Sequence, residues 1–132
     1  MKHFIFSTVF LLMFHAGFSQ VPPKIDQYWL VILKTGPKDM LITDTAERRK
    51  IFEGHFANIM RLYKEGIIKA AGPFGKNDLT WRGLFIFDCK TREEAEQYVQ
   101  TDPSVKAGVF IIDIVPWYSE AVGSFVHGKP GE

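Results

Sequence analysis

An α+β domain is predicted from four apolar runs that alternate with two amphipathic helices. The apolar runs are short and rich in aromatic and β-branched residues, as is typical of strands, and they cover residues 28–33, 67–71, 81–87 and 109–115. The helical patterns cover residues 45–65 and 92–100. The order is therefore βαββαβ. Right-handed crossovers over one sheet then give a ferredoxin-like sandwich of four antiparallel strands with both helices on one face.

The first helix is the longest predicted element, and its apolar stripe contains a histidine. Asp44 with Glu47 indicates an N-terminal capping box, and Gly66 indicates the C-terminal stop. Apolar side chains recur at spacings of three and four and so share one face, which comprises Phe52, Phe56, Ile59, Leu62 and Tyr63. His55 falls in the same stripe. It is either a structural histidine bonded at the edge of the core or an imidazole at the floor of a pocket, where it serves proton transfer.

The other predicted boundaries come from capping and proline signals. Thr91 with Glu94 indicates a capping box at the start of the second helix. Prolines are expected to end three elements: the second strand at Gly72-Pro73, the second helix at Asp102-Pro103 and the last strand at Pro116. Residues 104–108 are expected to form a turn or a single helical turn.

The N-terminus has the layout of a secretory signal peptide. Lys2 precedes an apolar run over residues 4–14, and the small residues Gly17 and Ser19 follow it. The run is shorter than the roughly 20 residues that a membrane span needs, although an uncleaved anchor is the alternative. We expect a signal peptide over residues 1–19, a lead-in over 20–27, the domain over 28–117 and a C-terminal tail over 118–132. The expected location is periplasmic or secreted, with no membrane association after cleavage.

The composition of the mature chain excludes several function classes. Removing 19 of the 132 residues leaves 113, with 15 basic residues once Lys2 is lost against 15 acidic ones, so neither nucleic acid nor an anionic membrane is an expected partner. The single cysteine, Cys89, cannot form an intrachain disulfide, and its neighbour Asp88 disfavours a thiolate. His55 and His127 offer no zinc-binding spacing. We expect no metal and no cofactor.

A homodimer is predicted from the first strand, whose two faces are both apolar. Trp29, Val31 and Leu33 alternate with Tyr28, Leu30 and Ile32. One face meets the helices, so the other must be covered by something else, and a second copy of the chain is the simplest cover.

Two segments resemble the YCII-related domain family. GHFANIMRLYKEGIIKAAGPF, residues 54–74, is similar to a block of that family with a histidine, a leucine-rich turn, Glu-Gly, a strand and Ala-Gly-Pro. TREEAEQYVQTDPSVKAGVFIIDIVPW, residues 91–117, is similar to a second block, in which a Glu- and Ala-rich helix leads to Asp-Pro, a glycine and the last strand. With the first strand, the resemblance covers residues 28 to about 117.

The resemblance implies a dimeric α+β barrel of ferredoxin-like subunits and a histidine–aspartate pair, here His55 and Asp102. Some members of the family are dechlorinating enzymes that act on hydroxylated aromatics. This chain differs from the family pattern in having Ser104 after Asp-Pro in place of an aromatic or bulky residue, in its leader and in its tail. These differences affect the substrate more than the fold.

An aspartate beside the histidine would fix the imidazole tautomer and make the other ring nitrogen a better proton acceptor. The predicted chemistry is cofactor-independent acid–base catalysis, lyase- or dehalogenase-like, on a small aromatic or keto–enol substrate. The predicted catalytic residues are His55 and Asp102, and the predicted substrate-binding residues are Pro73, Trp81 and Ser104. The alternatives are a ligand-binding or interaction module without catalysis, and a core histidine without any ligand.

Overall fold

The computed structural model describes residues 24–120, so the predicted signal peptide and residues 121–132 of the predicted tail lie outside the described part. Its elements are, in chain order, β1 (Ile25–Thr35), α1 (Thr45–Lys64), β2 (Ile68–Pro73), β3 (Trp81–Phe87), α2 (Arg92–Val99), α3 (Pro103–Lys106) and β4 (Phe110–Glu120). Within residues 24–120, no helix has both the length and the hydropathy needed to cross a membrane.

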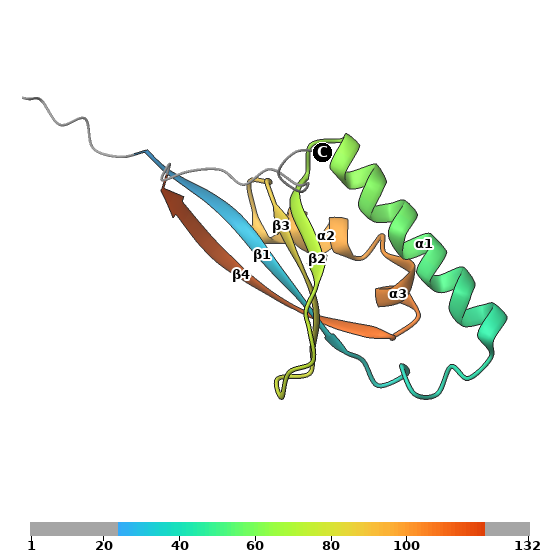
Figure 1. Ribbon diagram of the computed structural model, residues 1–132. Helices are drawn as coiled ribbons and strands as arrows, with labels where there is room; N and C mark the ends of the chain where they lie inside the picture. Colours follow the sequence, from blue (N-terminus) through green and yellow to red (C-terminus); the bar gives the residue numbers. More distant parts are fainter. Residues whose placement is uncertain (1–23, 121–132) are drawn as a thin grey trace, which may run out of the picture.

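The four strands form one antiparallel sheet in the order β2-β3-β1-β4. β1 and β3 are therefore the central strands, with β4 beside β1 at one edge and β2 beside β3 at the other. The helices lie together on one side of the sheet (Figure 1). This order confirms the predicted ferredoxin-like fold. The dimeric arrangement of that fold stays a prediction, because one chain is described.

β4 extends past the proline that was predicted to end it, whereas β2 ends at its proline, as predicted. Pro116 lies within β4, opposite Trp29, and Pro73 is the last residue of β2, opposite Gly83. Both strands lie at edges of the sheet, where a residue without an N–H can be accommodated. β1 correspondingly begins at Ile25, inside the predicted lead-in, because it pairs with the extended end of β4.

The ends of α1 agree with the capping signals, and its buried face matches the predicted stripe except at two positions. The Asp44 side chain accepts a hydrogen bond from the Glu47 N–H at 2.8 Å, and Gly66 has φ 79°. Phe56 and Tyr63, however, are 62% and 59% exposed, whereas the buried residues of α1 are His55, Asn58 and Leu62. Phe52 and Ile59 are partly buried against the core, so α1 buries the predicted face but a narrower part of it, together with Asn58. Phe56 follows the buried His55 and is turned by about 100° around the helix, so it lies at the edge of the buried face.

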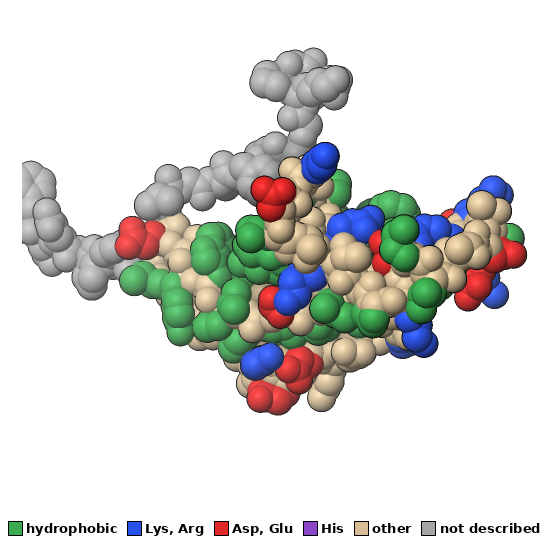
Figure 2. Space-filling model, turned by 90° about the horizontal axis from the view of Figure 1, so that it is seen from below, with side chains coloured by type: hydrophobic (Ala, Val, Ile, Leu, Met, Phe, Trp, Pro, Cys, Tyr) green, Lys and Arg blue, Asp and Glu red, His purple; other side chains and the backbone are tan. Residues whose placement is uncertain are grey.

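The core lies between the helices and one face of the sheet. The fully buried side chains of Val31, Phe87, Leu62 and Val99 come from β1, β3, α1 and α2. No helix among residues 24–120 lies on the opposite face of the sheet, where the β4 residues Ile111, Val115 and Trp117 are 40–44% exposed. In the space-filling view, apolar side chains gather where the beginning of β1 lies beside the end of β4, with few charged groups among them (Figure 2).

Candidate active site

His55 and Asp102, 47 positions apart in sequence, form a buried pair. His55 comes from the middle of α1 and is 7% exposed, while Asp102 is fully buried as the N-cap of α3. His55 Nδ1 lies 2.7 Å from Asp102 Oδ2. Pro103 occupies the first turn of α3, so Asp102 has extended backbone geometry and its side chain turns back toward α1.

Ser104 supplies two further hydrogen bonds to the Asp102 carboxylate. Its backbone N–H donates to Oδ1 at 2.8 Å, and its hydroxyl donates to the same oxygen at 2.6 Å. The Ser104 hydroxyl oxygen also lies 3.2 Å from His55 Nδ1. A carboxylate that accepts from three donors is a good acceptor in its charged form, so Nδ1 carries the ring proton and donates it to Asp102. His55 Nε2 is then the ring nitrogen with a free lone pair.

A network beside the pair connects α1 to the end of α2. The buried Asn58 side chain accepts at Oδ1 from Arg61 and from the Thr101 hydroxyl, both at 2.9 Å. Thr101 immediately precedes Asp102, so these bonds hold the backbone that carries the carboxylate. They also explain why an amide is buried in α1, because its acceptor oxygen is satisfied.

A cavity of about 360 Å³ opens against His55, between α1 and the helix-facing side of the sheet. It is lined by residues of α1, β1, β2, β3 and β4: Leu33, Phe52, His55, Phe56, Ile59, Ala71, Gly72, Pro73, Arg82, Gly83, Phe85 and Phe110. Four phenylalanine rings surround the imidazole, with centroids 5.4–6.1 Å from its own, at positions 52, 56, 85 and 110. Nδ1 bonds to Asp102, and none of the hydrogen bonds among residues 24–120 uses Nε2. Nε2 is therefore available to a molecule in the cavity.

Among residues 24–120, Arg82 is the single Lys, Arg, Asp or Glu side chain in this lining. The register between β1 and β3 passes from Leu33 opposite Gly83 to Lys34 opposite Trp81, so Arg82 is the extra residue of a β-bulge. A bulge breaks the alternation of side chains and can re-aim one of them. In a regular strand, Arg82 and its neighbour Gly83 would point to opposite faces of the sheet. With the bulge, both residues line the cavity.

The Asp39 carboxylate holds Arg82 in place together with a second arginine. Asp39 Oδ2 accepts from Arg82 at 3.1 Å, and Asp39 Oδ1 accepts from Arg48 at 2.6 Å. Burial alone would raise the pKa of Asp39, but the hydrogen bonds and charges of Arg48 and Arg82 outweigh it and hold the pKa below its usual value. The carboxylate is therefore ionised at neutral pH.

The structure brings together some of the predicted site residues and separates others. Pro73 lines the cavity. Trp81 does not line it, because the bulge places Arg82 there and Trp81 instead packs on Phe74 with ring centroids 5.4 Å apart. Ser104 is fully buried behind His55 and contacts Asp102, so its hydroxyl does not reach the cavity.

Sequence reasoning missed Asp39, Arg48 and the four phenylalanines as a group. Asp39 lies between the first predicted strand and the first predicted helix, and Arg48 lies in the first turn of that helix. Phe110 and Phe85 were assigned only to strands. The available signal was the single arginine within the strand WRGLFIF, which is otherwise made of apolar residues and glycine.

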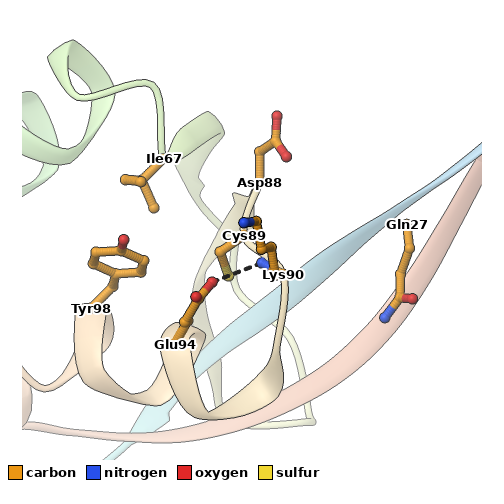
Figure 3. A pocket seen from close by; sticks show the side chains of 7 residues that line it. All are labelled: Gln27, Ile67, Asp88, Cys89, Lys90, Glu94 and Tyr98. Atoms are coloured by element: carbon orange, nitrogen blue, oxygen red, sulfur yellow. Dashed lines mark hydrogen bonds between the residues drawn. The ribbon is translucent and has the colours of Figure 1, made fainter.

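A second hollow, of about 600 Å³, lies where β3 leads into α2 and is lined by Gln27, Ile67, Asp88, Cys89, Lys90, Glu94 and Tyr98 (Figure 3). Burial raises the pKa of the Cys89 thiol to about 11, and the carboxylates of Glu94 and Asp88 add to the rise. The Glu94 carboxylate accepts a hydrogen bond from the Lys90 backbone N–H at 2.8 Å, drawn as a dashed line in Figure 3. This hollow therefore offers no reactive thiol. No group of three or more metal-ligating side chains occurs among residues 24–120.

The fold and the site define a small α+β domain that places a buried histidine–aspartate pair at the wall of a cavity of small-molecule size. The chain belongs to the YCII-related domain family, whose model matches residues 28–118, well over half of the sequence. Among solved structures it is similar to 5-chloro-2-hydroxyhydroquinone dehydrochlorinase (TftG) from Burkholderia phenoliruptrix AC1100 in complex with 2,5-dihydroxybenzoquinone. The match has 22% identity and a TM-score of 0.47 and covers 76% of this chain and 95% of that one. None of the curated proteins matches.

Proposed function

We propose that the protein is a small-molecule enzyme that uses His55 for proton transfer without a cofactor. The observation that carries the proposal is the 2.7 Å contact between His55 Nδ1 and Asp102, which leaves Nε2 as the free nitrogen of a ring that lines a 360 Å³ cavity. A fixed tautomer with one free nitrogen is what a general base requires. The aromatic walls suit a flat ring, so the proposed substrate is a small aromatic or keto–enol compound, and the proposed reaction is lyase- or dehalogenase-like.

The proposed mechanism assigns one task to each residue. Nε2 of His55 takes an acidic proton from the bound substrate, and the imidazolium that forms is stabilised by the Asp102 carboxylate on Nδ1–H. The same imidazolium then returns the proton to the product or to water. Asp102 is a positioning residue, because it is buried behind the ring and acts through His55. Ser104 holds Asp102 in turn.

The test follows hydrogen–deuterium exchange at acidic C–H positions of keto–enol compounds and hydroxylated aromatics in D₂O by NMR. Wild-type protein should accelerate exchange for at least one compound class. His55→Ala should reduce the rate by about 10²–10⁴-fold, the usual contribution of a general base. Asp102→Asn should also reduce it strongly, because its amide can donate to Nδ1 and so place the ring proton on Nε2.

Control measurements separate catalysis from the alternatives. Both variants should keep the wild-type far-ultraviolet circular dichroism, and a low melting temperature would instead mark a structural pair. Compounds that bind in the cavity without any His55-dependent exchange would support a ligand-binding module and reject the enzyme.

The proposal includes a homodimer joined through the uncovered face of the sheet. Ile111, Val115 and Trp117 expose apolar surface there around the Lys34–Asp113 ion pair, and exposed apolar patches often mark an interface. Light scattering on residues 20–132 tests it at micromolar concentration. Val115→Lys should convert the dimer to a monomer, whereas a wild-type monomer rejects the idea.

Export to the periplasm or beyond is the remaining part of the proposal. It rests on Lys2, the apolar run over residues 4–14 and the small residues Gly17 and Ser19. N-terminal sequencing of the exported protein should give Gln20 first. A chain that still begins at Met1 contradicts cleavage.

A further inference from the structure

We infer that Arg82 is an anion-binding residue of the cavity and that the molecule bound beside His55 is a small anionic ring compound, such as a phenolate, an enolate or an aryl carboxylate. This inference rests on the proposed function for the role of the site, but its evidence is the charge balance around Arg82.

The cavity contains a positive charge that its surroundings do not neutralise. Asp39 is the carboxylate bonded to Arg82, and it is shared with Arg48. Arg48 takes the larger part, because it donates to the Asp39 side chain at 2.6 Å and to the Asp39 carbonyl at 2.8 Å. Two guanidinium groups share one carboxylate, so the cluster of Arg48, Arg82 and Asp39 has a net charge of +1, and Arg82 is its member that lines the cavity. Within the part of the chain that the structure describes, no carboxylate lines the cavity itself.

Arg82 also has unused hydrogen-bond donors. A guanidinium has five N–H groups, and among residues 24–120 Arg82 makes one side-chain hydrogen bond, from Nη1 to Asp39. Its guanidinium carbon lies 5.7 Å from the Phe110 ring centroid, and the His55 ring centroid is also 5.7 Å from that of Phe110. The cation and the proposed base thus share one aromatic wall, and a ring molecule against Phe110 is within reach of both.

Because the rest of the lining is mostly apolar, an anion can bind in this cavity only if a positive charge such as that of Arg82 pairs with it. Most of the cavity wall is apolar, and an anion in an apolar site is strongly disfavoured unless it is paired and hydrogen-bonded. A planar guanidinium supplies both, since it bonds carboxylate and similar oxygens through two parallel N–H groups. The bulge that aims Arg82, the ring of Phe110 and the carboxylate of Asp39 together fix its position.

The experiment compares benzoate with benzamide, which have the same ring and similar size but differ in charge. Their affinities are measured by NMR titration in the His55→Asn background, so that the imidazole cannot supply the charge. Benzoate should bind about tenfold more tightly than benzamide, a difference typical of one charge-assisted contact. Arg82→Gln should abolish the preference and leave benzamide binding unchanged. Arg82→Lys should keep part of it, and this variant decides the matter where Arg82→Gln does not fold.

Arg92→Gln is the matched control, because it removes the same charge from α2, whose residues do not line the cavity. It should leave the benzoate preference unchanged. Absent binding of both probes at millimolar concentration, or a preference that survives the loss of the Arg82 charge, overturns the inference. The exchange assay is a separate measurement: an Arg82-dependent preference without His55-dependent exchange rejects the proposed function alone, and the reverse result rejects the role of Arg82 alone.

Discussion

Gly54 of α1 faces Pro103 of α3 at a distance that no larger residue permits. A Cβ built on Gly54 would lie 2.8 Å from Pro103 Cγ and 3.3 Å from Pro103 Cβ. Gly54 immediately precedes His55, and Pro103 immediately follows Asp102. The missing side chain therefore lets the two helices approach closely enough for the imidazole and the carboxylate to meet.

Gly54→Ala should weaken the pair although alanine favours helices. In an open helix the change would stabilise by about 1 kcal/mol. Here the methyl group must displace the rigid proline ring, so the melting temperature should not rise, and any His55-dependent exchange rate should fall by about tenfold or more. Gly75→Ala is the control, because nothing lies within 4 Å of a Cβ at that position. An increase in stability with an unchanged exchange rate would show that the contact between α1 and α3 accommodates a methyl group at position 54.

Ser104→Ala tests whether the serine positions Asp102. It removes the hydroxyl that donates to Oδ1 at 2.6 Å and leaves the backbone N–H in place. Loss of one buried hydrogen bond to a charged group should cost about 1–3 kcal/mol in urea unfolding. The exchange rate should fall, because the imidazole is then held less well. Ser119→Ala, which removes a hydroxyl bonded only to the adjacent Glu120 carbonyl, should change neither quantity.

Local sequence signals predicted the fold, and the family resemblance predicted the pairing of His55 with Asp102. Capping residues fixed where α1 begins and ends, and apolar runs placed the strands. His55 stood out as a polar group in an apolar stripe, and the family resemblance supplied its partner. Helices on one face of a four-stranded sheet then pack side by side, which brings the two residues within reach.

The remaining features depend on tertiary context that local patterns do not contain. Pro116 fits inside β4 only because that strand is at an edge of the sheet. Phe56 lies outside the buried row of α1, which runs through His55, Asn58 and Leu62. Arg82 enters the cavity in place of Trp81 because of a bulge opposite Leu33 and Lys34, and nothing in the strand sequence specifies a bulge.

Cys89 should resist alkylation although it is only partly buried. Burial first, and then Glu94 and Asp88, raise the pKa of its thiol to about 11, so the reactive thiolate is scarce at neutral pH. Iodoacetamide should modify the folded protein much more slowly than the same protein in urea, and the two rates should converge only as the pH approaches 11. Cys89→Ser should leave His55-dependent exchange unchanged. Rapid alkylation at neutral pH would show that the hollow beside α2 activates the thiol.

Asp39→Asn should change how stability depends on acid. The pKa of Asp39 in the folded protein lies below its ordinary value of 3.8, so the contribution of the carboxylate is complete above about pH 4 and is lost as the pH falls through the folded pKa. At pH 7 the variant should be less stable than wild type by about 1–3 kcal/mol, because Arg48 and Arg82 lose a charged acceptor. The difference in free energy of unfolding between wild type and variant, measured by urea unfolding, should decrease as the pH is lowered from about 5 toward 3. Asp78→Asn, in the exposed loop before β3, is the control and should give a curve parallel to that of wild type. A constant gap for Asp39→Asn across this range would show that the carboxylate is not held ionised by the two arginines.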